Sequence, residues 1–368
     1  VSRRLASANG DSGQQTQSGK GPVCSWLVCQ NADARNRAVD VQGVARSGWD
    51  HAVNVVLIET ASPDRPGSMQ RYADLIELAL SGDSAFQVSR MTLAPTAAAL
   101  QSYPRRLRML LHHATITWRA MRHVRSADVD VFHLVDGSHG YVARWLLRRR
   151  SVVTVHDMIP FLQTQQRFPV AAPSRGARWV IQAGIRALRH ANRVMADSEA
   201  TAQDLVNAES ALAGRVQVVP LAVLPSMLPE AGVVLSSWHA RRTHDRPYIL
   251  HLGNNGFYKN RVGVVRIFDR IRSETGCRLI LAGPPPDEII QSTIYERGLD
   301  RDVEFVIDPD DADIRSLYRM ARLLLFPSYY EGFGWPPLEA MAWGCPVVCS
   351  RSGSLPEVVG EAALTADV

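Results

Sequence analysis

The sequence predicts an α/β protein with two domains, each built on a parallel β-sheet that helices cover. The apolar run 323–326 shows no polar alternation, and such runs are typical of strands that are buried on both faces of a parallel sheet. Strand-like runs alternate with amphipathic helical segments along most of the chain, which is the pattern of repeated βα units. A chain of 368 residues is long for one hydrophobic core and is sufficient for two domains.

Residues 1–50 are predicted to be a poorly ordered extension. They are rich in Ser, Gly, Gln and Asn, and their apolar patch at 24–29 is shorter than the centre of a signal peptide. The first βα unit begins at Val53, where a buried strand (VNVVLIET) is followed by a turn-rich loop and by a helix that ends at Gly82. We therefore expect an N-terminal domain over residues 51–225.

Residues 102–125 are expected to form a basic amphipathic helix, because Arg and His alternate there with apolar residues such as Leu110 and Trp118. A helix of this kind can lie on an anionic bilayer. The alternative is a solvated helix face that shields the core. Nucleic acid is not an expected partner, since no recognition motif accompanies these basic residues.

Two further buried strands, in segments 129–137 and 151–161, each place a histidine near the carboxyl end, His133 and His156. Ligands of open α/β sheets bind at that edge, so both are candidates for function, with a structural histidine as the alternative for each. The run 136–140 (DGSHG) lacks the leading glycine of a nucleophile elbow.

The rest of the N-terminal domain continues the βα pattern. A helix is expected near 174–191, and Ser198 and Glu199 are predicted to begin the next one. Residues 226–246 are expected to be the linker between the domains.

The second domain, residues 247–368, opens with a strand, the loop LGNNGFYKN and a helix. This loop matches neither the dinucleotide-binding glycine pattern nor the P-loop, so dehydrogenase and P-loop functions are disfavoured. Of the 41 basic residues only Lys20 and Lys259 are lysine, and a lysine in this loop indicates a site that needs a compact ammonium group.

Metal sites are not expected. The acidic residues Asp308, Asp310, Asp311 and Asp313 lack the glycine and glutamate of an EF-hand, and acidic residues before an apolar helical period cap helices. The five cysteines form no pair of C-x-x-C motifs, which disfavours both zinc and a disulfide framework and indicates a reducing cytoplasm.

Residues 322–350 combine a strand, a glycine loop, a helix and a second strand. Pro336 and Pro337 can open the helix, and Gly344 can close it. Gly332, Phe333 and Gly334 would then present free N–H groups at a helix N-terminus, where a phosphate can bind.

Glu331 and Glu339 bracket this loop. If both lay on one helix, eight residues at about 1.5 Å each would separate them by about 12 Å. Because glycosidase carboxylates need about 5 to 9.5 Å, we expect two separate contacts on one ligand, with the anion of that ligand between them.

The segment EGFGWPPLEAMAWGCPVVCS, followed by SLPEVVGEAAL, resembles the E-x7-E segment of the retaining glycosyltransferases of family 4, glycosyl transferases group 1. The resemblance extends over residues 53–368. It implies the GT-B fold, in which two Rossmann-like domains with parallel sheets face a cleft. Members usually continue for several tens of residues beyond this point, so the C-terminal part is expected to be incomplete.

The resemblance also implies roles for individual residues. Glu339 would hold the ribose of a nucleotide-sugar, Glu331 and His156 would lie by the transferred sugar, and the 332–334 amides would hold the distal phosphate. The remaining donor-site candidates are Lys259 at the diphosphate, Gly253 and Asn254 in its loop, Val306 and Ile307 beside the base, and Gly67 in the loop after the first strand. Asn254 stands where many relatives have Arg, and Ser68 and Gln70 stand where further glycines are expected.

The implied function is metal-independent transfer of a hexose from a nucleotide-sugar to the hydroxyl of a glycan, polysaccharide or lipid-linked acceptor, with retention of configuration. The nucleotide-sugar is a substrate, so no cofactor is expected. The implied location is cytoplasmic, with or without peripheral contact of residues 102–125 with the inner membrane face. Two alternatives remain: a truncated, non-catalytic domain that binds nucleotide-sugar or a partner, and a sugar-nucleotide epimerase or phosphorylase on the same fold.

Overall fold

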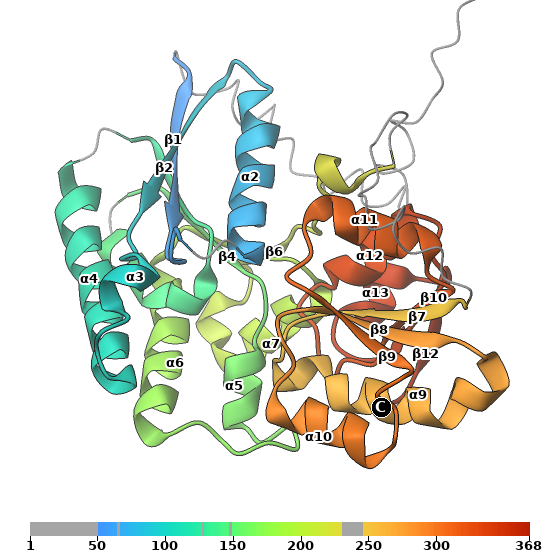
Figure 1. Ribbon diagram of the computed structural model, residues 1–368. Helices are drawn as coiled ribbons and strands as arrows, with labels where there is room; N and C mark the ends of the chain where they lie inside the picture. Colours follow the sequence, from blue (N-terminus) through green and yellow to red (C-terminus); the bar gives the residue numbers. More distant parts are fainter. Residues whose placement is uncertain (1–50, 65–66, 127–128, 147–148, 230–245) are drawn as a thin grey trace, which may run out of the picture. The chain divides into compact units, whose positions relative to one another are not determined.

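Two parallel sheets of six strands organise this protein, as the computed structural model shows for residues 51–64, 67–126, 129–146, 149–229 and 246–368 (Figure 1). The strand order is β2-β1-β3-β4-β5-β6 in the first sheet and β12-β11-β10-β7-β8-β9 in the second. The predicted extension at 1–50 and most of the predicted linker at 226–246 lie outside the described residues.

The first sheet and its helices comprise β1 (Val53–Glu59), α2 (Ser68–Ser81), β2 (Phe86–Thr92), α3 (Ala97–Leu100), α4 (Arg105–Ser126), β3 (Val131–Leu134), η1 (Gly137–Leu146), β4 (Ser151–Val155), α5 (Ile159–Thr164), α6 (Arg175–Ala187), η2 (Leu188–His190), β5 (Arg193–Ala196), α7 (Glu199–Ala208), η3 (Ser210–Leu212), β6 (Val216–Val218) and η4 (Pro225–Met227). The second sheet and its helices comprise β7 (Tyr248–Leu252), η5 (Phe257–Lys259), α9 (Arg261–Thr275), β8 (Arg278–Gly283), α10 (Glu288–Glu296), β9 (Val303–Ile307), α11 (Asp311–Met320), β10 (Leu323–Phe326), α12 (Trp335–Ala342), β11 (Val347–Ser350), α13 (Leu355–Val359) and β12 (Leu364–Ala366).

The central strands of each sheet are buried on both faces, which explains why they show no polar alternation. In β1, Val55 and Leu57 belong to the core that α2 covers, whereas Val56 and Ile58 pack in the core that includes Ile116 of α4. In the second sheet, α9 and α10 lie on one side and α11, α12 and α13 on the other (Figure 1). The predicted α/β class and the parallel sheets are thus confirmed.

Most predicted elements occur close to their expected bounds. The strand expected over 151–161 is the exception, because β4 ends at Val155 and α5 begins at Ile159 with Pro160 in its first turn. Ser198 caps α7 through its side chain, as expected, and α12 has proline in its first turn. Strands β2 and β12 and helix α10 were not predicted. Strand β2 was missed because it lies at an edge of the sheet and its residues are only partly buried, so it lacks the continuous apolar run of a central strand.

Each sheet has a point at which the chain changes direction across the sheet. In the second sheet this point lies between β7 and β10, since β8 and β9 continue on one side and β11 and β12 on the other. Ligands of open α/β sheets bind at the carboxyl ends of the strands at such a point. The loops that leave β7 and β10 there are 253–259 and 327–334, which contain the predicted site residues Lys259 and Glu331.

Candidate functional site

Lys259 and Glu331 form a buried ion pair where these two loops meet. The ammonium group of Lys259 donates to both carboxylate oxygens of Glu331, at 2.9 and 3.0 Å. The side chains are 12% and 8% exposed, and the ring of Phe326 lies 4.9 Å from Nζ. The structure therefore places together two residues that the sequence assigned to different parts of a ligand.

The glycine loop after Glu331 presents its N–H groups without partners. Among the described residues, none accepts a hydrogen bond from the N–H of Gly332, Phe333 or Gly334. Gly334 precedes α12 with a φ of +108°, a backbone conformation that glycine adopts at little cost. Because the loop leads directly into a helix N-terminus, these free donors suit an anion.

Three serine hydroxyls hold the carbonyl side of the same segment. Ser350 donates to the carbonyl of Ser328 at 2.5 Å, and Ser352 donates to that of Tyr329 at 2.5 Å. Ser354, which is fully buried, donates to the carbonyls of Phe333 and Glu331 at 2.5 and 3.1 Å. These hydrogen bonds to its carbonyl oxygens hold the loop in one conformation.

Gly332 packs against residues of the first sheet. Its carbonyl accepts hydrogen bonds from Ser198 at 2.6 Å and Thr201 at 3.2 Å. A Cβ on Gly332 would overlap the carbonyl oxygen of His156. Glycine is therefore required here for close approach of two backbones.

His156 directly follows β4 and uses both ring nitrogens within the protein. Nδ1 donates to Asp197 at 2.6 Å, and Nε2 donates to the carbonyl of Val135 at 2.7 Å. Burial disfavours the imidazolium, but the hydrogen bond and negative charge of Asp197 outweigh this effect, so the pKa of His156 is raised. A hydrogen bond from this imidazole to a sugar would require one of the two bonds to break.

Glu339 lies in α12 with only 3% of its surface exposed, and it accepts a hydrogen bond from the hydroxyl of Tyr318 at 2.9 Å. Burial raises the pKa of Glu339, and the Tyr318 hydrogen bond and the charge of Arg71 oppose that rise. Arg71 itself pairs with Asp311 at 2.5 Å.

The other predicted donor-site residues surround these groups. A Cβ on Gly253 would lie 3.3 Å from both His251 Nε2 and Lys259 Cδ, so this position is crowded. Asn254 accepts a hydrogen bond from the N–H of Gly256 at 2.8 Å and thereby shapes its own loop.

The candidates for the base and for the first glycine loop differ in their surroundings. Val306 is buried and Ile307 is 45% exposed, at the carboxyl end of β9. Gly67 has open space around the position of a Cβ.

The structure decides one alternative that the sequence leaves open. His133 is buried and bonded to the hydroxyl of Thr154 at 2.8 Å, which is the structural alternative. In the acidic segment, Asp310 caps α11, as predicted, whereas Asp311 forms an ion pair with Arg71. Among the described ranges, no group of three or more His, Cys, Asp or Glu side chains has an arrangement that could hold a metal ion.

Several residues of the site were missed from the sequence. Asp197, Tyr318 and Ser354 contact predicted residues from other segments of the chain. Ser350 and Ser352 bond the carbonyls of Ser328 and Tyr329 in the segment before the loop. The position of Asp197 at the carboxyl end of β5 was a usable signal, because His156 stands at the equivalent end of β4. The three serines at alternate positions, of which Ser350 ends β11, had no such signal.

Two family models match most of the chain. The model of glycosyltransferase family 4 matches residues 49–226, and that of glycosyl transferases group 1 matches residues 237–366. No helix in the described part of the chain is long and apolar enough to cross a membrane.

Similar proteins include O-antigen chain mannosyltransferase B of Escherichia coli, 30% identical over 70% of this chain and 65% of that protein. Another is the MMP alpha-(1->4)-mannosyltransferase of Mycolicibacterium hassiacum, 30% identical over 57% of this chain and 50% of that protein. The chain thus spans less than two thirds of the length of either relative.

Solved structures share the fold. Sucrose-phosphate synthase from Thermosynechococcus elongatus has a TM-score of 0.69 at 19% identity, over 86% of both chains. WaaG, a glycosyltransferase involved in lipopolysaccharide biosynthesis, has a TM-score of 0.62 at 15% identity, over 85% of this chain and 86% of that one. The two parallel sheets and these similar structures show the GT-B fold. Because the two family models match its two halves, the chain belongs to the glycosyltransferases of family 4, glycosyl transferases group 1.

Proposed function

We propose that this protein transfers a sugar from a nucleotide-sugar to an acceptor hydroxyl, with retention of configuration and without a metal ion. The observation that supports this most is the loop 332–334, whose N–H groups are free while hydroxyl groups bind the carbonyls of the same segment. A buried carboxylate lies on each side of the loop, and Lys259 lies beside the first. A nucleotide-sugar has the matching groups: a diphosphate for the amides and the ammonium, and hydroxyls for the carboxylates.

In the proposed mechanism the protein mainly positions the reactants and stabilises the leaving group. The acceptor hydroxyl attacks from the face that the diphosphate leaves, and a diphosphate oxygen receives the hydroxyl proton. Lys259 and the loop amides stabilise the negative charge that develops on the diphosphate. Glu339 binds the ribose, Glu331 orients the sugar, and His156 contacts the sugar by exchanging its bond to Asp197 or to the carbonyl of Val135.

The ion pair adds a step to this account. Lys259 and Glu331 neutralise each other in the ion pair. When the donor binds, its diphosphate competes for Lys259, and the sugar hydroxyls replace the ammonium as donors to Glu331. Exchange of partners would thus couple donor binding to the orientation of the sugar.

The transferred sugar is proposed to be a hexose, with mannose as the first to test, because both relatives described above are named mannosyltransferases. The proposed acceptor is a glycan, polysaccharide or lipid-linked saccharide, and the proposed location is the cytoplasm.

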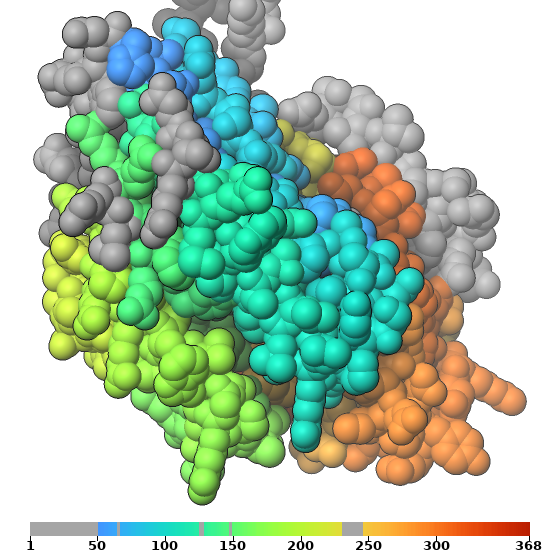
Figure 2. All heavy atoms as spheres, turned by 90° about the vertical axis from the view of Figure 1, so that its left-hand side faces the viewer, coloured from blue at the N-terminus to red at the C-terminus, as the bar shows by residue number. Residues whose placement is uncertain are grey.

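Peripheral contact with the inner membrane face through α4 is part of the proposal. Ile116, Ala120 and Val124 of this helix are buried in the core of the first sheet. Leu110 and Trp118 are 66% and 53% exposed, on a helix whose teal surface faces the viewer in Figure 2. Apolar side chains among arginines suit an anionic bilayer. We expect co-sedimentation with phosphatidylglycerol vesicles to decrease for Leu110→Glu, and equal sedimentation would contradict the contact.

The function is tested with UDP-, GDP- and ADP-sugars, by their effect on the melting temperature and by release of nucleotide in the presence of an acceptor. We expect Glu339→Ala to weaken donor binding and Glu331→Ala mainly to lower kcat, whereas the exposed Glu361→Ala serves as a matched control. Unchanged donor affinity in Glu339→Ala would contradict its assignment. Binding without turnover would indicate a non-catalytic domain, and release of free sugar or hexose phosphate without an acceptor would indicate an epimerase or phosphorylase.

A further inference from the structure

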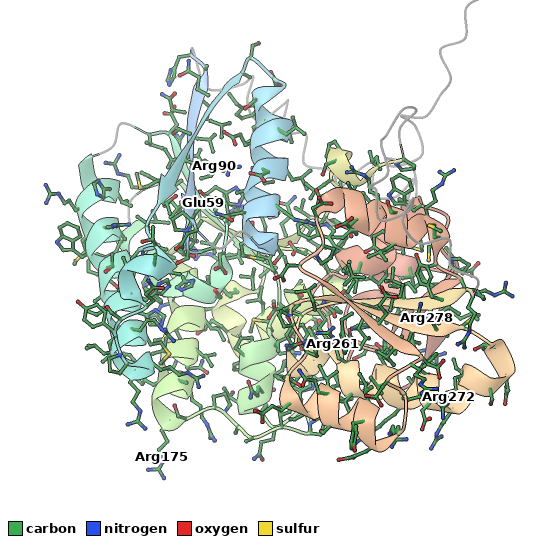
Figure 3. The ribbon with its side chains drawn as sticks, viewed as in Figure 1. Glu59, Arg90, Arg175, Arg261, Arg272 and Arg278 are labelled. Carbon is green, nitrogen blue, oxygen red and sulfur yellow. The ribbon has the colours of Figure 1, made fainter. Side chains whose placement is uncertain are left out.

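Arg261 is a buried guanidinium with unpaired N–H groups, directly behind the loop that contains Lys259. It is the first residue of α9, and only 3% of its surface is exposed. Nη1 donates to the side-chain oxygen of Asn255 and, at 3.3 Å, to the carbonyl of Pro284. Nε and Nη2 are buried and have no hydrogen-bond partner among the residues that the structure describes. In Figure 3 the labelled Arg261 lies among the elements of the second sheet, whereas Arg175 projects outward.

The charge of Arg261 has no carboxylate to balance it. Other labelled arginines of this half form ion pairs: Arg272 with Asp302 at 3.3 Å and Arg278 with Glu304 at 3.2 Å. No described carboxylate lies within 4.0 Å of Arg261. Burial lowers the pKa of Arg261, and only the charge of Asp287 acts against that shift. A buried cation without a counter-ion is unfavourable, so an anion that comes near it is attracted.

The two neighbouring basic side chains carry no net positive charge. Lys259 is neutralised by Glu331. His251, whose Nε2 is also buried without a partner, is neutral because burial lowers its pKa to about 3. Three basic residues lie near the carboxyl end of β7: His251, Lys259 and Arg261. Of these, only Arg261 has a positive charge that no bonded carboxylate of the described residues balances.

Arg261 also joins the two loops that follow β7 and β8. Asn255, which accepts from Arg261, donates to the carbonyl of Pro285 at 2.7 Å. The guanidinium is therefore held at a fixed place behind the loop 253–257, so little reorganisation is needed when a ligand arrives.

We propose that Arg261 provides a second positive charge for the donor site and lets the site prefer nucleoside diphosphates to monophosphates. It acts across the loop as a fixed charge and positioning residue, without contact with the sugar. This inference rests on the proposed function, because it takes the diphosphate of the donor as the anion. Many relatives are expected to have an arginine at the position of Asn254, and in this chain Arg261 would supply that positive charge instead.

The test compares binding of a nucleoside diphosphate, its monophosphate and the uncharged nucleoside by calorimetry, with whichever base of UDP, GDP and ADP binds best. We expect Arg261→Met to raise the Kd of the diphosphate about tenfold, that of the monophosphate less, and that of the nucleoside not at all, since the attraction scales with ligand charge. Arg261→Lys keeps the charge, and Asn255→Ala keeps the charge but removes its partner. Both are expected to retain the preference for diphosphate.

A folded Arg261→Met protein with an unchanged ratio of the two Kd values would overturn the inference. If that variant does not fold, Arg261→Gln decides, because it removes the charge and keeps a polar side chain next to Asn255 and the carbonyl of Pro284. An Arg261→Gln protein with the wild-type ratio of the two Kd values would overturn the inference. Failure of the wild-type protein to bind any nucleotide or nucleotide-sugar would instead overturn the proposed function.

Discussion

The ion pair of Lys259 and Glu331 allows a quantitative prediction. At an effective dielectric constant of about 20, unit charges 2.9 Å apart attract each other by about 6 kcal/mol. Desolvation of both groups offsets part of this attraction. Removing one partner leaves a buried charge without compensation, so Lys259→Met and Glu331→Gln are each expected to lower the free energy of unfolding, the former by about 3 to 5 kcal/mol.

A double-mutant cycle measures the interaction itself. Urea unfolding of the wild type, both single variants and the double variant should give a coupling free energy of about 2 to 3 kcal/mol. The exposed pair of Arg351 and Asp367 is the control, and its coupling should stay below about 1 kcal/mol. A Lys259–Glu331 coupling no larger than that of the control would refute the ion pair and the proposed exchange of partners.

Three further predictions concern the surroundings of the site. Ser354→Ala removes the hydroxyl donor to the carbonyl of Phe333, whereas the carbonyl of Glu331 keeps the backbone N–H of residue 354 as a donor at 3.2 Å. The change should destabilise the protein by about 1 to 3 kcal/mol and raise the KM for the donor, measured by urea unfolding and initial rates; an unchanged KM would contradict its effect on the loop. Glu357 accepts hydrogen bonds from the N–H groups of Glu199 and Ala200 at the start of α7, at 2.9 and 3.2 Å. Glu357→Ala should therefore lower the free energy of unfolding by about 1 kcal/mol, measured by urea unfolding. An unchanged free energy would show that water replaces this cap. Burial and the charge of His156 lower the pKa of His133 from 6.5 to about 4. Between pH 6.5 and pH 4 the unfolded state therefore binds more protons than the folded state, so the stability falls as the pH drops, by about 2 kcal/mol at pH 5. Thermal melts at pH 7 and pH 5 should show this loss in the wild type and not in His133→Gln.

Much of the fold follows from the sequence by local physics. Buried strands such as β1 and β10 reveal themselves through continuous apolar runs, because both faces of a parallel sheet are covered. Caps such as Ser198 and Asp310 are readable because the donors they satisfy lie three residues away in the chain. Strand β2 was missed for the converse reason, since a partly exposed edge strand carries a weaker pattern.

The sequence by itself determined the α/β class, the glycine loop between two glutamates, and a lysine placed at the end of the strand that opens the second domain. Only the tertiary structure decided which charges meet. It pairs Lys259 with Glu331, commits both nitrogens of His156 to Asp197 and Val135, and leaves Arg261 buried without a counter-ion. The physical reason is that hydrogen bonds and desolvation depend on atoms brought together from distant segments, and neither composition nor spacing records those distances.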